Sequence, residues 1–394
     1  MRAAYVCVDS GVPVFGFKGC SIHVQEMIYA FKQAGIQISL FSNNVEGRRT
    51  HTLSGIRIRR LPFVSSEYRY AREESGMAMN DLLPAVLQSA GKLDFVYERH
   101  SLWSYAAMEW ASSHGIPTFI EVNAPLIEEQ MKYRQLLHKE EAYAAARRAF
   151  HAASFIIAVS REVQKYVLQF SVNPQKVIVM TNGVNPFRFP RGLDPALKAP
   201  ANVFTVGFLG SLKPWHGLSN LIDAFEILYR KDFRIRLLLI GDGPERKSLT
   251  EKLVQKELLG AVHFTGMVSP SEVPRFLASI DVAVAPYPEM EGLYFSPIKI
   301  FEYMAAGLPM VVSDIGQLSE IIQHEVTGLV SPPGDSFLLA RAIERLQQSP
   351  DLRMRLGLAA RTKALRDHTW NKNAQRILDL VDQRRSRLAT AGGA

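Results

Sequence analysis

The chain has 394 residues, a length that predicts two domains rather than one. Its composition, 47% hydrophobic and 21% charged, is that of an ordinary folded protein and argues against a disordered or fibrous one. The formal net charge of +8 is spread along the chain, and no basic run with interleaved aromatic residues indicates a nucleic-acid partner. Such a charge suits a phosphate-bearing ligand or a weak peripheral membrane contact, but it does not choose between them.

The sequence also bears on the compartment. No run of about 18 apolar residues is present, which argues against a membrane span. Cys7 and Cys20 are too few for a disulfide framework, and neither has metal-ligand spacing. We therefore expect a cytoplasmic protein, which could also lie peripherally at the inner face of the membrane.

Short apolar runs alternate with segments of helical periodicity, the pattern of a parallel sheet covered by helices on both faces. The strands expected in the first half are Ala3–Cys7, Gln37–Ser42, Phe95–Glu98, Thr118–Val122, Phe155–Val159 and Lys176–Met180. The helices expected there are Ser21–Ala34, Leu102–Ser113, Glu128–Ala152 and Arg161–Phe170.

Four prolines then interrupt the pattern, and residues 186–202 are predicted to be a linker. Beyond it, the expected strands are Phe204–Leu209, Arg236–Ile240, Val262–Thr265, Val282–Ala285 and Met310–Ser313. The expected helices are Leu218–Arg230, Glu245–Glu257, Ser271–Ala278, Lys299–Ala306, Leu318–His324 and Ser336–Gln348.

Two successive parallel sheets predict an α/β protein with two Rossmann-like domains, 1–185 and 203–370, facing across a deep cleft. A last helix, at about 371–388, is expected to pack back on the first domain. Ligands of such sheets bind beyond the carboxyl ends of the strands.

Glycine-rich turns follow three of the predicted strands, at Gly11–Gly19, Gly207–Gly217 and Gly241–Gly243. Backbone N–H groups at a strand-to-helix turn, with the positive end of the helix dipole, can hold an anion. Lys213 and His216 add donor groups beside the second turn. Each turn alone could be merely structural, but three at strand ends favour a phosphate-bearing ligand.

The stretch Phe295–Pro309, FSPIKIFEYMAAGLP, is the most informative segment. Pro297 is expected at the first position of a helix, where the missing N–H costs no hydrogen bond. The N–H groups of about Ser296–Lys299 would then point at a bound phosphate. Glu302, over one turn into the helix, can accept two hydrogen bonds from a ribose diol.

This stretch resembles the donor-binding signature of the retaining family 4 glycosyltransferases (group 1), of which S-P-x-K-x-x-E-Y-M-A-x-G-x-P is a variant. Four further segments resemble family segments in order and spacing: TNGVNPFRF at Thr181–Phe189, VGFLGSLKPWHG, GDGPERKSL, and HFTGMVS at His263–Ser269. The similarity covers nearly the whole chain and implies the GT-B architecture.

The resemblance implies transfer of a hexosyl unit, with retention, from a UDP- or GDP-linked sugar to a hydroxyl of a glycan, lipid or small molecule. It implies no cofactor beyond this donor and no metal, in keeping with the absence of a D-x-D sequence.

The resemblance also assigns residues. It implies that the diphosphate is bound by Ser296, Pro297, Ile298 and Lys299, and the ribose by Glu302. The phosphate loop contains Gly210, Ser211 and His216, and the residues near the base are Gly243, Met267 and Val268. Gly19 lies in the loop of the first domain that faces the diphosphate. His100 approaches the donor sugar, and Arg99 is the alternative candidate for that role. Glu121 and Asn123 lie on the acceptor side. The expected catalytic residues are His100, Lys299 and Glu302, although His100 could equally be a packed or capping histidine.

The chain departs from the family pattern at three positions. Ser211 and His216 stand where an arginine and a lysine are usual, so neutralisation of the phosphates shifts to Lys213 or Lys299. Tyr294 precedes Glu302 by eight residues, where an acidic residue was expected. Either Glu289 or Glu291 replaces it, or no acid does. These departures leave two alternatives open, a sugar-nucleotide 2-epimerase and a non-catalytic nucleotide-binding module.

Overall fold

The computed structural model describes residues 1–63 and 68–391 and divides the chain into two compact units. Unit 1 comprises Met1–Asn182, Tyr294–Ser296 and the C-terminal segment from Trp370 onward, and unit 2 comprises Gly183–Leu293 and Pro297–Thr369. Residues 186–202, expected as a linker, are thus grouped with unit 2. The short stretch Tyr294–Ser296 is grouped with unit 1, although both its neighbours along the chain belong to unit 2.

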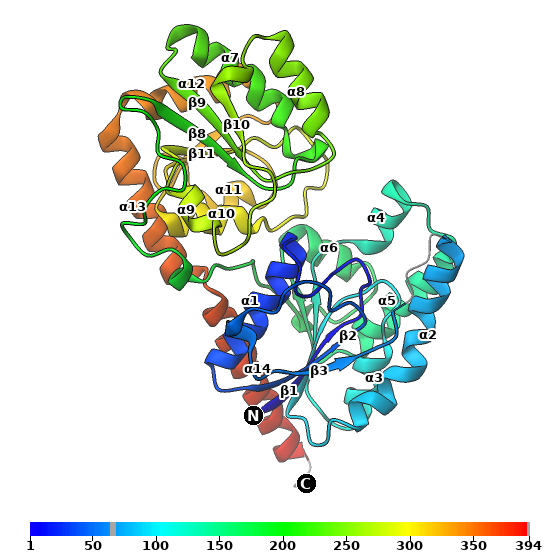
Figure 1. Ribbon diagram of the computed structural model, residues 1–394. Helices are drawn as coiled ribbons and strands as arrows, with labels where there is room; N and C mark the ends of the chain where they lie inside the picture. Colours follow the sequence, from blue (N-terminus) through cyan, green and yellow to red (C-terminus); the bar gives the residue numbers. More distant parts are fainter. Residues whose placement is uncertain (64–67, 392–394) are drawn as a thin grey trace. The chain divides into compact units, whose positions relative to one another are not determined.

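Unit 1 is built on a seven-stranded parallel sheet with the order β3-β2-β1-β4-β5-β6-β7 (Figure 1). Its strands are β1 (Arg2–Cys7), β2 (Gln37–Ser42), β3 (Arg57–Arg60), β4 (Phe95–Arg99), β5 (Thr118–Val122), β6 (Phe155–Ala158) and β7 (Val177–Val179). Its helices are α1 (Gly19–Gln33), α2 (Arg69–Gln88), α3 (Ala106–Ser113), α4 (Leu126–Tyr133), α5 (Lys139–Ala152), α6 (Arg161–Leu168) and α14 (Trp370–Ala391).

Unit 2 has a six-stranded parallel sheet with the order β10-β9-β8-β11-β12-β13. Its strands are β8 (Phe204–Leu209), β9 (Ile235–Ile240), β10 (Val262–Phe264), β11 (Val282–Ala285), β12 (Met310–Ser313) and β13 (Leu329–Ser331). Its helices are α7 (Leu218–Lys231), α8 (Arg246–Gln255), α9 (Val273–Leu277), α10 (Ile298–Ala306), α11 (Leu318–Ile321), α12 (Ser336–Gln348) and α13 (Pro350–Asp367).

Both sheets reverse their strand order beside the first strand of the unit, between β1 and β4 in unit 1 and between β8 and β11 in unit 2. The loops that leave two such strands separate to opposite faces of the sheet, which opens a ligand-binding crevice at their carboxyl ends. The predicted fold class, two Rossmann-like α/β domains, is confirmed, and each sheet has one topologically preferred place for a site.

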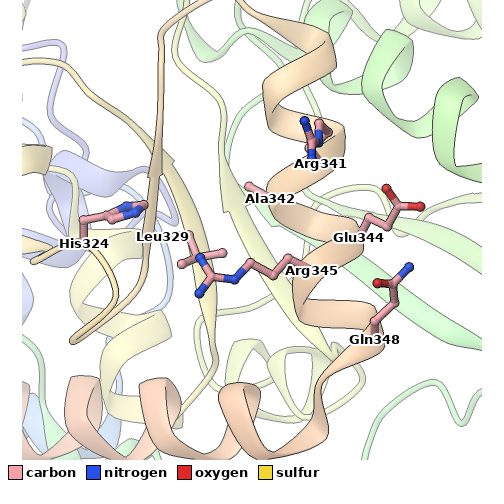
Figure 2. A pocket seen from close by; sticks show the side chains of 7 residues that line it. All are labelled: His324, Leu329, Arg341, Ala342, Glu344, Arg345 and Gln348. Atoms are coloured by element: carbon pink, nitrogen blue, oxygen red, sulfur yellow. The ribbon is translucent and has the colours of Figure 1, made fainter.

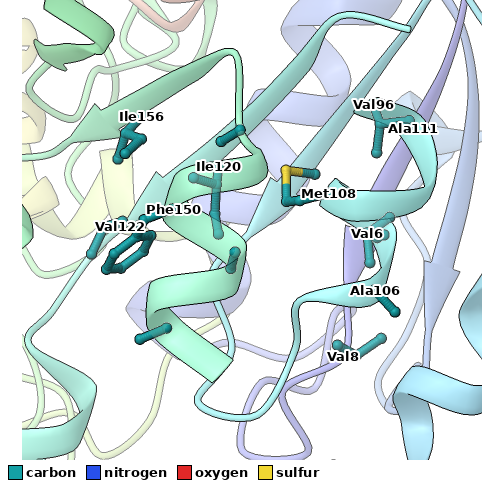
Figure 3. Packing of buried hydrophobic residues seen from close by; sticks show 14 of the residues in the cluster. Val6, Val8, Val96, Ala106, Met108, Ala111, Ile120, Val122, Phe150 and Ile156 are labelled. Atoms are coloured by element: carbon teal, nitrogen blue, oxygen red, sulfur yellow. The ribbon is translucent and has the colours of Figure 1, made fainter. Parts of the chain in front are cut away.

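The core of unit 1 packs one face of the sheet against α2, α3, α5 and α6 (Figure 3). Figure 3 shows Phe150 of α5 and Met108 of α3 in this cluster together with Ile120, Val122 and Ile156 of the strands. The other face is covered by α1 and α14, where Phe31 of α1 lies 5.5 Å from the ring of Phe95. Burial on both faces accounts for the continuously apolar strands that made the sheet predictable.

Every predicted strand is present with ends within one residue, but the sequence analysis missed β3, β13, α2 and α13. β3 is an edge strand of sequence RIRR whose apolar signal is weak. α2 contains Gly76 and Pro84, which both disfavour a helix. Gly76 is needed there because a Cβ at this position would lie 2.3 Å from the indole of Trp103.

The predicted helix Glu128–Ala152 is wrong as a single element, because it is two helices, α4 and α5. The interruption is stabilised by the buried carboxylate of Glu73, from α2. It accepts hydrogen bonds from the backbone N–H groups of Leu137, at 3.1 Å, and His138, at 2.9 Å. This cap comes from 64 or more residues away, so no local pattern could reveal it.

Candidate active site

The loops after β8 and β9 in unit 2 interlock through their glycines. Gly210 and Gly241 have φ angles of +146° and +131°, which favour glycine. A Cβ at Gly241 would lie 2.1 Å from the carbonyl oxygen of Gly210. A Cβ at Gly243 would lie 2.5 Å from the carbonyl oxygen of Leu212. Gly243 is predicted to lie near the nucleotide base. In the structure, the group that leaves no room for a side chain at Gly243 is the backbone of the adjacent loop.

Helix α10 is fixed to the carboxyl end of β8 by Tyr303. The fully buried Tyr303 hydroxyl accepts a hydrogen bond of 2.7 Å from the backbone N–H of Leu209, the last residue of β8. Pro297, expected as the first helical residue, is instead the N-cap, because α10 begins at Ile298. Ile298 and Lys299 therefore form the first turn, whose N–H groups have no intrahelical acceptor.

Lys299 points from this first turn toward the glycine loops. Its Nζ lies 2.8 Å from the position that a Cβ on Gly210 would take, and 4.1 Å from the ring centroid of Phe208. Among the described residues this buried Nζ has no hydrogen-bond partner. Burial lowers the pKa of Lys299 to about 7, although the charge of Glu302 opposes the shift. A buried, unpaired ammonium group at the β8/β11 crevice is the arrangement that an anionic ligand would complete.

His216 does not supply the second cation. Its Nδ1 lies 2.5 Å from the carbonyl oxygen of Ser211, which can only accept, so Nδ1 carries the proton. Burial, and then the charge of Lys299, lower the pKa of His216 to about 3. The ring is therefore neutral at pH 7 and leaves an acceptor lone pair on Nε2. Lys213, in the same loop, has its Nζ 5.4 Å from the ring centroid of Trp215.

Glu302 lies on α10 beside Lys299 and is paired with a residue that the sequence analysis missed. Arg188 Nη1 lies 3.2 Å from Glu302 Oε1, and the two side chains are 18% and 9% exposed. Arg188 belongs to the single-turn helix η3 (Pro186–Arg188), within the predicted linker. The base-side candidates lie in the loop after β10, where Met267 is 75% exposed and Val268 is half-buried.

Ser296 and Tyr294 belong to unit 1 in the structure. Ser296 Oγ accepts a hydrogen bond of 2.9 Å from the N–H of Asn182, and its carbonyl accepts one of 2.5 Å from Asn182 Nδ2. Ser160 Oγ donates to the carbonyl of Tyr294 at 2.8 Å, while the Tyr294 hydroxyl donates to Glu129. The side chain that replaces the family acid is therefore bound to a carboxylate of α4.

The two other replacements considered for that acid, Glu289 and Glu291, are exposed residues of the loop between β11 and α10.

In unit 1, His100 follows β4 at the β1/β4 crevice. Its backbone N–H donates to the carbonyl of Glu121 at 2.9 Å, and its ring centroid lies 4.9 Å from that of Phe150. Burial, and then the charge of Arg99, lower the pKa of His100 to about 3. In the described part of the chain neither ring nitrogen has a hydrogen-bond partner. The neutral imidazole keeps both a donor and an acceptor for a ligand.

Gly19 is the first residue of α1 and was assigned to the loop that faces the diphosphate. A Cβ added at Gly19 would meet no heavy atom within 4 Å, so space is open beside its backbone. The position is therefore accessible to a ligand, and nothing in its packing requires a glycine.

Glu121 is engaged in a buried pair. Its Oε1 lies 2.8 Å from Nε2 of His23, whose ring centroid lies 4.8 Å from that of Trp370 of α14, with the two rings tilted by 59°. Burial alone would raise the pKa of Glu121, but the charge and hydrogen bond of His23 outweigh it and lower the pKa. Arg99 lies beside Glu121 in the register of β4 and β5. Nη1 of Arg99 and Nδ2 of Asn123 are buried and have no hydrogen-bond partner among the described residues.

Comparisons with known proteins identify the family of the chain. The family model described as "Glycosyl transferases group 1" matches residues 203–349, and the one described as "Glycosyltransferase Family 4" matches residues 17–188. Together the two matches span most of the chain. It belongs to the group 1 glycosyltransferases of family 4.

Two relatives within this group differ in how much they share with the chain. The amylovoran biosynthesis glycosyltransferase AmsK of Erwinia amylovora is 29% identical over 241 residues, which are 60% of this chain and 58% of AmsK. The chain thus matches less than two thirds of that relative. The D-inositol 3-phosphate glycosyltransferase of Pseudarthrobacter chlorophenolicus is 23% identical over 392 residues, which are 92% of this chain and 89% of the relative.

Solved structures share the fold of this family 4 chain. Sucrose-phosphate synthase from Thermosynechococcus elongatus aligns with a TM-score of 0.74 at 19% identity, over 97% of this chain and 98% of its own. Anabaena HepE in complex with UDP and glucose aligns with a TM-score of 0.71 at 20% identity, over 97% of this chain and 99% of the HepE chain. At these identities the likeness shows the fold alone, and it confirms the GT-B architecture. No helix among the described residues is long and apolar enough to cross a membrane.

Two surface pockets lie away from the family 4 donor residues. One, of about 370 Å³, is formed by β13 and the C-terminal half of α12, and Figure 2 shows Arg345 of α12 reaching toward Leu329. The other, of about 560 Å³, includes Phe204 at the start of β8. Both lie toward the amino ends of the strands, opposite the glycine loops, and neither is lined by a predicted site residue.

Proposed function

We propose that this chain transfers a hexosyl unit from a nucleoside diphosphate sugar to a hydroxyl acceptor, with retention at the anomeric carbon. The observation that carries the proposal is the buried, unpaired Nζ of Lys299 next to Gly210 at the β8/β11 crevice, unpaired among the described residues. A cation buried without a partner is costly unless a ligand pairs with it. A diphosphate is the ligand that fits both this cation and the adjacent first turn of α10.

The donor is a UDP- or GDP-linked sugar, and the complex of HepE with UDP and glucose makes UDP the first to test. Negative charge grows on the diphosphate as the bond to the sugar breaks. Lys299 and the N-terminal N–H groups of α10 are preorganised to stabilise this charge, a contribution typically of about 3–4 kcal/mol per donor. No metal ion takes part in this step, so turnover is expected to persist in excess EDTA. Complete loss of turnover in EDTA, restored by a divalent ion, would contradict this.

At the sugar, the arrangement favours attack of the acceptor on the face that the diphosphate leaves. No carboxylate is assigned as a nucleophile, because the Tyr294 hydroxyl is already bound to Glu129 and the two nearby glutamates are exposed. The leaving phosphate takes the proton of the acceptor hydroxyl. To His100, neutral and with both ring nitrogens unpaired within the described chain, we assign the role of orienting a sugar hydroxyl, because its imidazole can both donate and accept a hydrogen bond.

The proposal is tested with a thermal-shift panel of UDP, GDP, ADP and dTDP sugars, since a ligand stabilises the fold in proportion to its occupancy. We expect one nucleotide to raise the melting temperature and Glu302→Ala to abolish the rise. A panel without any stabilising nucleotide would contradict the proposal, and unchanged binding by the variant would contradict the role of Glu302.

The product and the reaction without acceptor complete the test. NMR of the freshly formed linkage is expected to show the anomeric configuration of the donor, and an inverted product would remove the claim of retention. Incubation of the donor alone is expected to leave it unchanged apart from slow hydrolysis. Rapid epimerisation there would favour the 2-epimerase instead.

A further inference from the structure

Arg188 joins two parts of the donor site that are far apart in the sequence. Its Nη1 lies 3.2 Å from Glu302 Oε1 on α10, and its Nη2 donates to the carbonyl of Pro270 at 2.6 Å. Pro270 ends the loop that carries the base-side candidates Met267 and Val268. One guanidinium thus contacts both the ribose-side carboxylate and the base-side loop, each through its own nitrogen.

The turn that carries Arg188 is itself well fixed. The side chain of Asn185 caps η3 by accepting a hydrogen bond of 3.2 Å from the N–H of Phe187. The backbone N–H of Val184 donates to the carbonyl of His368 at 2.9 Å. Because the backbone is held just before the turn and within it, the position of the guanidinium is restricted.

A carboxylate in the place of Glu302 needs such a partner. Glu302 is only 7% exposed, and burial without a cation would favour its protonated form, which accepts hydrogen bonds poorly. A ribose diol must donate two hydrogen bonds to one carboxylate, which requires that the group be charged and rotationally fixed. Lys299 on the same helix also contributes positive charge, but Arg188 makes the direct contact with Oε1.

We propose that Arg188 is a positioning residue that fixes Glu302 so that its carboxylate accepts hydrogen bonds from the 2′- and 3′-hydroxyls of a ribose. By its bond to Pro270, Arg188 also positions the base-side loop against the same nucleoside. The chain therefore discriminates ribonucleotide from 2′-deoxyribonucleotide donors. This inference rests on the proposed function, because it assumes that Glu302 binds the ribose.

The test uses the full-length protein with UDP and 2′-deoxy-UDP in isothermal titration. The wild type is expected to bind UDP about tenfold more tightly than 2′-deoxy-UDP, since the deoxy compound leaves one oxygen of the Glu302 carboxylate without its hydrogen bond. Arg188→Gln is expected to weaken UDP binding and to reduce that ratio to about twofold or less. Arg188→Lys, which keeps the charge but can reach only one of the two acceptors, is expected to retain an intermediate ratio.

A matched control and a double variant separate positioning from folding. Arg191→Gln removes an exposed arginine three residues further on and is expected to leave both affinities unchanged. Arg188→Gln combined with Glu302→Gln is expected to bind no more weakly than Glu302→Gln alone, because the two residues act as one unit.

A merely structural role for Arg188 would weaken both nucleotides equally, and an unchanged ratio in folded Arg188→Gln or Arg188→Lys would overturn the inference. A wild-type ratio near one would overturn it too, without any variant. Failure of the wild type to bind any nucleoside diphosphate would instead contradict the proposed function, so the two failures are distinguishable.

Discussion

The two units share a strand order but differ in how charge is arranged at the carboxyl ends of their sheets. In unit 2, the carboxylate of Glu302 is paired with Arg188, while the ammonium of Lys299 has no partner among the described residues. In unit 1, the carboxylate of Glu121 is paired with His23, and the imidazole of His100 is neutral. One fold therefore presents an ammonium group at one crevice and a neutral imidazole beside the guanidinium of Arg99 at the other, so the chemistry of each crevice depends on these side chains rather than on the fold.

This difference predicts that substitutions in the two units separate ligand binding from stability. A change at the unpaired cation of unit 2 is expected to affect the donor, and a change at the paired carboxylate of unit 1 is expected to affect the folded state. Three substitutions test this difference between the two units.

The largest effect is expected from Lys299→Ala in unit 2. If Lys299 meets the diphosphate as we propose, its removal should lower kcat/KM at least about 100-fold, or about 3 kcal/mol, because its charge is most stabilising when the leaving group is most negative. Steady-state kinetics with the preferred donor measures this. Lys247→Ala, at a lysine that is 91% exposed, serves as the control and should change nothing. A loss of less than about threefold in folded Lys299→Ala would mean that the reaction does not depend on this cation of unit 2.

A smaller effect is expected from His23→Ala in unit 1. The substitution leaves the buried carboxylate of Glu121 without its partner, so the free energy of unfolding should fall by about 2–3 kcal/mol, as measured by urea denaturation. UDP affinity of the folded variant should stay within about twofold of the wild type, because Lys299 and Glu302, to which we assign the main contacts with the nucleotide, belong to unit 2.

The loss of stability in His23→Ala is expected to depend on pH. The pKa of Glu121 is lower in the folded chain than its usual value of 4.5. The pairing therefore stabilises the protein above that value and is lost as the pH falls through the folded pKa. The difference between wild type and His23→Ala should shrink in acid. A difference that grows in acid would mean that Glu121 is not the group that His23 stabilises.

The smallest effect is expected from His216→Lys, which restores a charge usual at this position in the family that the chain resembles. A second cation near the diphosphate should tighten UDP binding by about threefold, an amount limited by repulsion from Lys299. Isothermal titration measures it, with the uncharged His216→Gln as control. Weaker binding by the lysine variant than by the glutamine variant would show that the neutral ring, and not missing charge, is what this position requires.

The residues of the proposed donor site lie in a few contiguous segments of the sequence. Gly210, Lys299 and Glu302 come together once β8 and α10 adopt the topology that their own patterns indicate. Arg188 could not be found in this way, since it is 114 residues from Glu302 and lies in a segment whose prolines indicated only a linker. The pattern TNGVNPFRF did mark the segment, but not which residue in it would reach α10.

Unit 1 was less predictable because its site depends on pairs between distant elements. Glu121 was a candidate from the sequence, but its partner His23 comes from α1 and lies against Trp370 of α14, and no periodicity connects these three residues. Tyr294 was identified as a departure from the family pattern, yet its partner Glu129 appears only when α4 is in place. Chemistry carried by long-range pairs is visible in a structure and not in a single sequence.

The central claim, that Lys299 is the charge that meets a nucleoside diphosphate, is tested most directly by the pH dependence of UDP affinity. Burial lowers the pKa of the unliganded Lys299 to about 7, and bound phosphate must raise it, so UDP binding takes up a proton above that pH. We expect affinity to fall by about tenfold between pH 7 and pH 9 in the wild type, and to stay level in Lys299→Arg, whose guanidinium remains charged. A wild-type affinity that does not change over this range would contradict the account.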